Sequence, residues 1–239
     1  MWRRVLIILT VVAVIGLFII PLHPVLNNMH RVALLGAILG AWLGSLLLIW
    51  KHKRLRFAYL AITLSLAVPL ALPGRVIPAN DLRAEYVARM TQLVDTRYVW
   101  GGESSRGIDC SGLPRKALRD ALVWRGLRQL DGGMLRMAVE QWCYDASANA
   151  LGQGYRNYTV PLLPHGTIRQ MDYASLMPGD LAVTTSGVHI LAYLGDEKWI
   201  QADPGIGAVA ILNGRNDKNR WFDVPVTTHR WSVLRLDTR

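Results

Sequence analysis

The first third of the chain lacks acidic residues entirely. Residues 1–73 contain no Asp or Glu, yet seven Lys and Arg residues lie there. Beyond residue 73 there are 20 Lys and Arg against 17 Asp and Glu, so most of the net charge of +10 arises in the N-terminal third. A nucleic-acid-binding domain carries its basic residues on a folded recognition surface. Here most of the excess flanks apolar runs, which argues against a nucleic-acid partner and indicates membrane topology.

Cysteine is also scarce, with only Cys110 and Cys143 present. An exported domain would permit one disulfide between them, but the chemistry inferred below requires Cys110 as a free thiol, so we expect no bond. No Cys and His spacing typical of metal sites occurs, and the sequence predicts neither a metal nor a cofactor. Internal repeats and low-complexity segments are absent from the sequence.

Three apolar runs precede Pro73, at Val5–Leu22, Val32–Trp50 and Phe57–Leu72. Crossing a bilayer takes roughly 20 helical residues, with about 17 as a lower limit. The first two runs are long enough, while the third is shorter and contains Pro69. Buried core helices are the alternative, but three such runs without one acidic residue favour a membrane anchor in the lipid bilayer.

The positions of the cations predict the orientation of this anchor. Positively charged loops stay in the cytoplasm, and only Arg31 lies between the first two runs. The domain after the third run is therefore expected on the extracytoplasmic side of the membrane. A cleaved signal peptide is the alternative for the first run, and with only two spans residues 74–239 would be cytoplasmic. The other cations of this region are Arg3 and Arg4 before the first run and Lys51, Lys53, Arg54 and Arg56 before the third.

Residues 1–73 are thus predicted to form the anchor, 74–80 a linker and 81–239 one domain. Helical patterns cover about 81–94, 110–123 and 134–150, and strand-like runs follow them. Helices first and strands afterwards predict an α+β domain with an antiparallel sheet. The strand-like runs are Asp180–Thr185, Val188–Leu194, Lys198–Ala202, Ala208–Leu212 and Trp231–Leu236.

Cys110 has the setting of a nucleophile. It opens a predicted helix directly after a loop with Gly101, Gly102 and Gly107. Free N–H groups at a helix start favour the thiolate and can hold an oxyanion, and glycines let a substrate backbone approach. Taken alone, however, a single cysteine is more often a small buried apolar residue.

A thiol nucleophile needs a base, and His189 is the best placed of the six histidines. It lies on an apolar strand-like run, whereas His165 lies in a Pro-rich loop and His229 beyond the fourth strand-like run. Taken alone, a satisfied core histidine is the alternative. The remaining three, His23, His30 and His52, adjoin the apolar runs.

Three ordered motifs resemble the NlpC family of papain-like cell-wall cysteine peptidases. The first joins Tyr98-x-Trp-Gly-Gly to Asp109-Cys110-Ser111-Gly112-Leu113, and the second is Pro178-Gly179-Asp180 followed by His189 through Gly195. The third, Ile200-Gln201-Ala202, lies where the family often has His in an Ile-His-Ala context. Together these motifs cover most of residues 82–212.

The resemblance implies roles for six residues. Cys110, His189 and Gln201 would form the catalytic set, with the Gln201 amide in place of the family's usual histidine. Asp203 shares a strand face with Gln201 and is the alternative orienting residue. The resemblance further implies a substrate-positioning hydroxyl at Tyr98, while Asp109 and Ser111 are expected to fix the turn and line the substrate groove.

One segment departs from the family pattern. The stretch between Cys110 and His189 is long, and an insertion at about 124–175 is expected either to line the groove or to form an aromatic packing layer that holds Cys143.

These features predict hydrolysis of peptidoglycan stem peptides, by resemblance at the γ-D-glutamyl–diamino acid bond. A catalytically inactive wall-binding or scaffolding module of the same fold is one alternative, because Gln201 departs from the pattern. A thiol acyltransferase or amidase acting on lipid-linked substrates is another. The sequence does not indicate an oligomeric state.

Overall fold

The computed structural model describes residues 1–76 and 78–235. It begins with three helices that are long and apolar enough to cross a membrane, by length and composition. They coincide with the three predicted runs, and Pro69 does not interrupt the third. Their bounds are α1, Trp2–Ile19; α2, Asn28–Leu48; and α3, Lys53–Ala71, with a short 3₁₀ turn, η1, at Ile20–Leu22.

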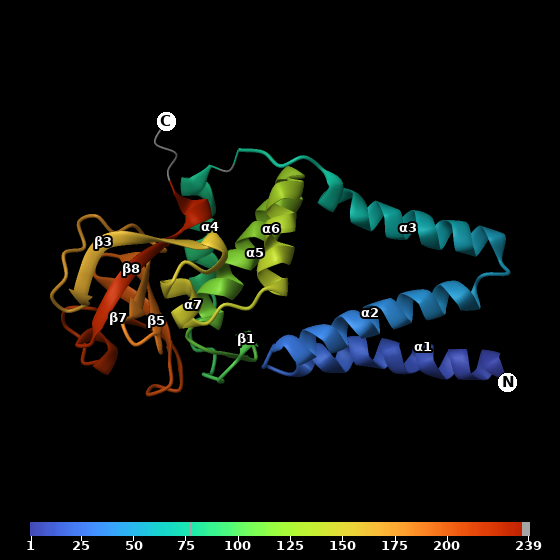
Figure 1. The fold of residues 1–239 in the computed structure, drawn as a ribbon, viewed down its shortest axis with the longest axis horizontal. Helices are drawn as coiled ribbons and strands as arrows, with labels where there is room; N and C mark the ends of the chain where they lie inside the picture. Colours follow the sequence, from blue (N-terminus) through green and yellow to red (C-terminus); the bar gives the residue numbers. More distant parts are fainter. Residues whose placement is uncertain (77, 236–239) are drawn as a thin grey trace.

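α1 and α2 pack side by side as an antiparallel pair, whereas α3 diverges from them and returns to the rest of the chain (Figure 1). Small residues permit the close approach, since a Cβ atom on Gly44 would collide with the side chain of Thr10. α3 touches α2 where Trp42 Nε1 donates to Thr63 Oγ1 at 3.1 Å. The N-terminus and the α2–α3 turn lie at the end remote from the other elements (Figure 1).

The remaining chain folds as the predicted α+β domain. Its six-stranded sheet has the order β3-β8-β4-β5-β6-β7, and every neighbouring pair is antiparallel. The helices are α4, Ala79–Thr91; α5, Gly112–Gln129; α6, Gly132–Cys143; and α7, Ala148–Gly152. The strands are β3, Thr159–Thr167; β4, Leu181–Thr184; β5, Ile190–Gly195; β6, Lys198–Asp203; β7, Ala208–Asn213; and β8, Pro225–Trp231.

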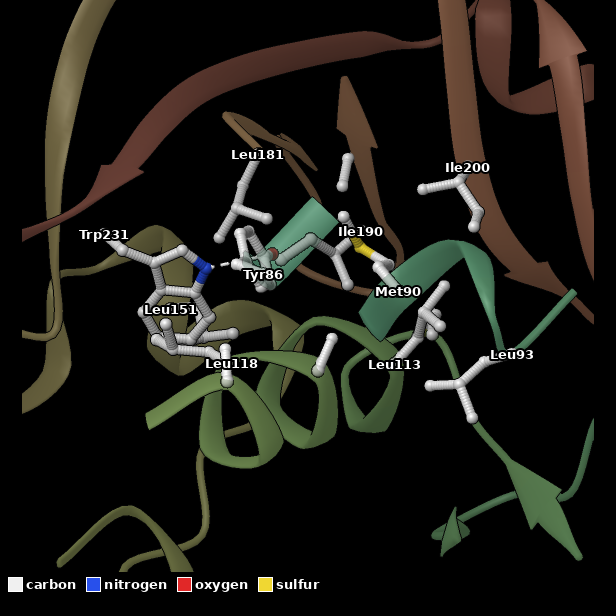
Figure 2. Packing of buried hydrophobic residues seen from close by; sticks show 14 of the residues in the cluster. Tyr86, Met90, Leu93, Leu113, Leu118, Leu151, Leu181, Ile190, Ile200 and Trp231 are labelled. Atoms are coloured by element: carbon white, nitrogen blue, oxygen red, sulfur yellow. Dashed lines mark hydrogen bonds between the residues drawn. The ribbon is translucent and has the colours of Figure 1, made fainter. Parts of the chain in front are cut away.

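The core lies where α4 and α5 pack against the sheet (Figure 2). Tyr86 and Leu118 come from the two helices, and Ile190 and Trp231 from the strands; all four are at most 1% exposed. Trp231 Nε1 donates to the Tyr86 hydroxyl at 3.0 Å, which satisfies a polar group inside the core. Burying an aliphatic side chain such as Leu118 or Ile190 stabilises the fold by roughly 1.5–3 kcal/mol.

A buried carboxylate ties the start of β4 to the rest of the domain. Asp180 accepts from Arg230 Nε at 2.7 Å and lies 3.6 Å from Arg83 Nη1. Gly179 just before it has φ +92°, and a Cβ atom there would come within 2.9 Å of the Tyr86 ring. The Pro-Gly-Asp motif is therefore a structural device that sets the strand preceding His189.

Several predicted boundaries are wrong for identifiable reasons. The helix expected at 134–150 is two helices, because Ser147 caps a new one by accepting from Ala150 N at 3.2 Å. The last strand, predicted at Trp231–Leu236, shares only Trp231 with the observed β8, and a 3₁₀ turn, η4, follows at Ser232–Leu234; Leu236 lies outside the described residues. The first helix of the domain ends at Thr91 rather than Val94.

The strand β3 was missed because of its prolines. β3 contains Pro161 and Pro164 together with His165, so the sequence indicated a loop. The strand lies at the edge of the sheet and pairs only with β8. Edge strands accept proline because one side of the strand needs no hydrogen-bond donors.

Candidate active site

Cys110 lies in a tight turn that precedes α5, two residues before the first helical residue. Asp109 builds this turn. Its Oδ1 accepts from Gly112 N at 2.6 Å and from Ser111 Oγ at 3.0 Å, and its Oδ2 accepts from Gly101 N at 2.9 Å. One carboxylate thus joins the glycine loop to the helix start and fixes the backbone on both sides of the sulfur.

The glycines of this loop serve packing more than substrate access. A Cβ atom on Gly102 would lie 2.5 Å from the Gly107 carbonyl oxygen, and one on Gly112 would clash with the Gly102 carbonyl. Gly107 belongs to a two-stranded hairpin of β1 (Glu103–Ser104) and β2 (Gly107–Ile108). Gly101, with φ +71°, is the glycine of this loop that lines the adjoining cleft.

The Cys110 sulfur rests against the backbone that carries His189. Sγ lies 3.9 Å from the Val188 carbonyl oxygen, and the backbone N–H of Ile190 also points to it. The residue is only 6% exposed, yet it forms part of the cleft wall. The sulfur therefore touches the residues on both sides of His189 in the sequence.

His189 is the residue immediately before β5, and not within the strand as predicted. Its Nε2 and the Oε1 of Gln201, on β6, lie 2.7 Å apart. An amide oxygen accepts only from a protonated ring nitrogen, so this bond favours the tautomer in which Nδ1 is free to accept a proton. Asp203, the alternative orienting residue, instead accepts from Gly205 N and Asn219 Nδ2.

The imidazole of His189 also packs against an indole ring. The ring of Trp221 stacks on His189 with centroids 4.0 Å apart and planes 11° from parallel. Trp221 belongs to a short turn, η3 (Arg220–Phe222), which Asn219 caps by accepting from Trp221 N at 3.0 Å. Sequence reasoning missed this contact because Trp221 lies 32 residues after His189, outside every motif.

Burial keeps both members of the candidate pair neutral. It raises the pKa of Cys110 to about 12, with a further contribution from the Asp109 charge. It lowers the pKa of His189 to about 4, although the Gln201 hydrogen bond acts in the opposite direction. Backbone N–H groups near Cys110 do favour the thiolate as expected, but desolvation outweighs them. Among the described residues, no hydrogen bond joins the Cys110 thiol to the His189 ring.

A cleft of about 680 Å³ opens beside the sulfur. Asp109 and Ser111 line it, whereas Tyr98 is not among its lining residues. Tyr98 is half-buried at the edge of the core, and its pKa is raised to about 12 by burial and then by the nearby Cys110 and Asp109.

Part of the predicted insertion lines the same cleft. Asp145, Ser147 and Tyr155 contribute to its wall. Cys143, expected inside an aromatic layer, is instead exposed at the end of α6. Both cysteines are free thiols.

The cleft also has a wall from outside the domain. Leu26 and Asn27, which connect the helices α1 and α2, lie along it together with Trp100. Trp100 belongs to the first motif, but no sequence feature pointed to the connection. Within residues 1–76 and 78–235, no group of three or more His, Cys, Asp or Glu side chains is arranged to hold a metal ion.

Comparison with known proteins gave one family and several distant structures. The chain is similar to the P60 domain of an M. avium subspecies paratuberculosis antigen (18% identity, 67% of this chain and 100% of that one, TM-score 0.39). It is similar to NlpC1 from Trichomonas vaginalis (16%, 66% and 46%, TM-score 0.42) and to the peptidoglycan hydrolase RipB from Mycobacterium tuberculosis (21%, 65% and 72%, TM-score 0.38). No curated protein matched. The NlpC/P60 family model matches residues 95–224, more than half of the sequence, and the chain therefore belongs to the NlpC/P60 family.

Proposed function

We propose that this protein is a membrane-anchored cysteine endopeptidase that hydrolyses stem peptides of peptidoglycan. Cys110 is the nucleophile, His189 the general base and Gln201 the residue that positions the imidazole. The observation that carries the proposal is the arrangement around His189. Its Nε2 is held by Gln201 at 2.7 Å, while the thiol of Cys110 packs against the adjoining backbone at the wall of an open cleft.

The mechanism is acyl transfer through a thioester. Nδ1 of His189 takes the thiol proton as sulfur attacks the amide carbonyl, and the same proton then passes to the leaving amine. A water molecule, activated by the imidazole, hydrolyses the thioester and restores the thiol. The N–H groups of Cys110 and Ser111 point toward the sulfur and are available to the developing oxyanion.

The resting pair is a neutral thiol and a neutral imidazole, because burial disfavours both charged forms. Proton transfer and attack must therefore be coupled, and Nδ1 has to come within hydrogen-bond reach of the sulfur. Catalytic hydrogen bonds are often long in the absence of substrate and tighten when it binds. The stacked Trp221 ring restricts movement of the imidazole to its own plane.

Family membership and the size of the site support the proposed substrate. RipB, one of the similar structures, is a peptidoglycan hydrolase by name, and a cleft of about 680 Å³ is large enough for a short peptide. We propose the bond between γ-D-glutamate and the diamino acid as the cleavage point. Tyr98, Asp109 and Ser111 are proposed to position the peptide, Tyr98 from beside the cleft and the other two from its wall.

The proposed location is the bacterial inner membrane, with the domain on the extracytoplasmic side. The cations at the N-terminus and in the α2–α3 turn lie at the same end of the helices, remote from the domain (Figure 1). Positively charged segments remain in the cytoplasm, so this arrangement supports an extracytoplasmic domain.

The full-length chain in lipid nanodiscs, incubated with cell-wall fragments, tests the proposal. Mass spectrometry should detect fragments that end in γ-D-glutamate. Cys110→Ala should abolish their release, while Cys143→Ala, which removes an exposed thiol at the end of α6, should leave it unchanged. Equal release by wild type and Cys110→Ala would show that the nucleophile is wrongly assigned.

A second function, a catalytically inactive wall-binding module, is favoured by one observation. The thiol is directed at the Val188 carbonyl at 3.9 Å instead of at the imidazole. Such a module would bind stem peptides with equal affinity in wild type and Cys110→Ala, and neither would release fragments in the same assay.

A further inference from the structure

The connection between α1 and α2 is docked onto the loop that precedes Cys110. Leu26 N donates to the Gly101 carbonyl at 3.2 Å, and Glu103 N donates to the Pro24 carbonyl at 3.2 Å. Val25 pairs with Gly102 as an isolated antiparallel bridge. The docked segment, residues 20–31, thus extends the backbone pairing of the active-site loop by one strand-like stretch.

Buried charges lock this contact. Arg31, in the first turn of α2, lies 3.0 Å from the Glu103 carboxylate, and both residues are less than 5% exposed. Arg119 Nη1 donates to the other Glu103 oxygen at 2.8 Å. Arg115 lies 3.6 Å from the same carboxylate, so these residues form a buried ion-pair network. Because breaking such a network costs stability, it holds the docked segment in one geometry. On the rim of the contact, Arg106 donates to the Pro21 carbonyl at 2.9 Å.

A second attachment holds the domain at the end of α3. Arg136 Nη1, on α6, donates to the Leu70 and Leu72 carbonyls at 2.7 and 2.8 Å. Arg75 N donates to Asp131, the residue that caps α6, at 3.1 Å. Two separate attachments fix the orientation of the domain relative to the helices, which a single flexible linker would leave free.

The docked segment places the cleft at the level of the helix ends. Leu26 and Asn27 line the cleft and lie within two residues of Asn28, where α2 begins. If α2 spans the bilayer, its N-terminal end lies at the membrane surface. This wall of the cleft, less than one helical turn from that end, then lies there too. Trp100, on the same cleft, is 78% exposed, and tryptophan is enriched at membrane–water interfaces.

We infer that the docked segment makes the active site a membrane-surface site, and that its preferred substrate is a stem peptide carried on a membrane lipid. This inference rests on the proposed function and specifies its substrate class. A peptide attached to a lipid in the same leaflet is already confined to the layer in which the cleft lies. A stem peptide in solution, or in wall polymer away from the membrane, must first be brought to that layer.

The test compares two forms of one peptide. Full-length protein in lipid vesicles receives the stem peptide either on a lipid diphosphate carrier or free in solution, at equal total concentration. Confinement to the membrane raises the local concentration, so kcat/KM for the lipid-linked form should exceed that for the free form by about tenfold or more.

Variants then separate docking from simple attachment to the membrane. Arg31→Gln should reduce this preference by about three- to tenfold, because the domain loses its fixed orientation. Arg106→Gln removes a contact on the exposed rim, does not threaten folding and should reduce it by less. Arg4→Gln, at the remote end of α1, should leave the preference unchanged.

The outcomes distinguish this inference from the proposed function. Equal kcat/KM for the two forms, with cleavage that still depends on Cys110, overturns the inference and leaves the peptidase proposal standing. A preference that survives both Arg31→Gln and Arg106→Gln overturns the role of the docked segment. If wild type cleaves neither form, the proposed function itself fails.

Discussion

The three N-terminal helices and the C-terminal domain place their apolar side chains in opposite ways. Phe18 on α1 and Leu66 on α3 are 72% and 75% exposed, whereas Leu118 on α5 is fully buried. The apolar side chains of the domain are buried against one another, whereas those of the three helices need an apolar environment from outside the chain. The proposed chemistry lies in the domain, where burial shifts the pKa values of Cys110 and His189, while the connection between α1 and α2 contributes one wall of the cleft.

Removing the His189 imidazole should give the largest loss of activity. Without such a loss, the comparison between a chemical domain and positioning helices would not hold. His189→Ala should lower kcat/KM by about 10³-fold, because a general base contributes on the order of 10²- to 10⁴-fold. His165→Ala, on the exposed face of the edge strand β3, is the matched control and should retain full activity. Comparable losses in both variants would place the base elsewhere.

Apolar truncations sharpen the contrast between the two regions. Leu118→Ala should destabilise the domain by about 2–5 kcal/mol, because it leaves a cavity in the core. Leu66→Ala should change the stability of the protein in nanodiscs by less than about 1 kcal/mol, since its side chain is exposed and leaves no cavity when it is shortened. Chemical denaturation followed by tryptophan fluorescence measures both; a large loss from Leu66→Ala would mean that α3 has a protein partner.

The hydrogen bond from His189 to Gln201 should matter less than the imidazole itself. Gln201→Leu removes the acceptor at 2.7 Å and should lower kcat by about 10- to 100-fold through loss of the correct tautomer and ring position. Gln201→His restores a polar group at the position where the family often has one, and should recover much of the activity. Full activity in Gln201→Leu would instead assign the orienting role to the Trp221 stack.

The smallest expected effect is the change of kcat/KM with pH. Burial lowers the pKa of His189 to about 4, so the imidazole remains neutral, and able to accept a proton, until the pH falls to that value. We expect kcat/KM to be constant from pH 7 to about pH 5 and to halve near pH 4, as a property of the coupled pair. An acidic limb near the ordinary histidine value of about 6.5 would indicate a solvated base.

The sequence predicted the elements whose patterns are local. The three apolar runs and the strands β4 to β7 were recognisable because their apolar residues and turn signals are contiguous. β3 was missed because its prolines are tolerated only at the edge of a sheet, and edge position is a property of the whole fold. Membership of the NlpC/P60 family was recognisable from three short motifs.

The contacts between distant segments were not predictable in the same way. Arg31 is the one cation between the first two apolar runs, and the sequence gives no indication of its partner. The structure gives the reason, since its partner Glu103 lies 72 residues away. Trp221 likewise reaches His189 only through tertiary folding.

The central claim, that Cys110 reacts because His189 activates it, is tested most directly by a stem-peptide analogue with a chloromethyl ketone in place of the scissile amide. The full-length protein should acquire one adduct, on Cys110 and not on the exposed Cys143, as located by peptide mass spectrometry. His189→Ala should slow the labelling by at least about 100-fold. Labelling of Cys143 alone, or labelling of Cys110 at the same rate without His189, would contradict the account.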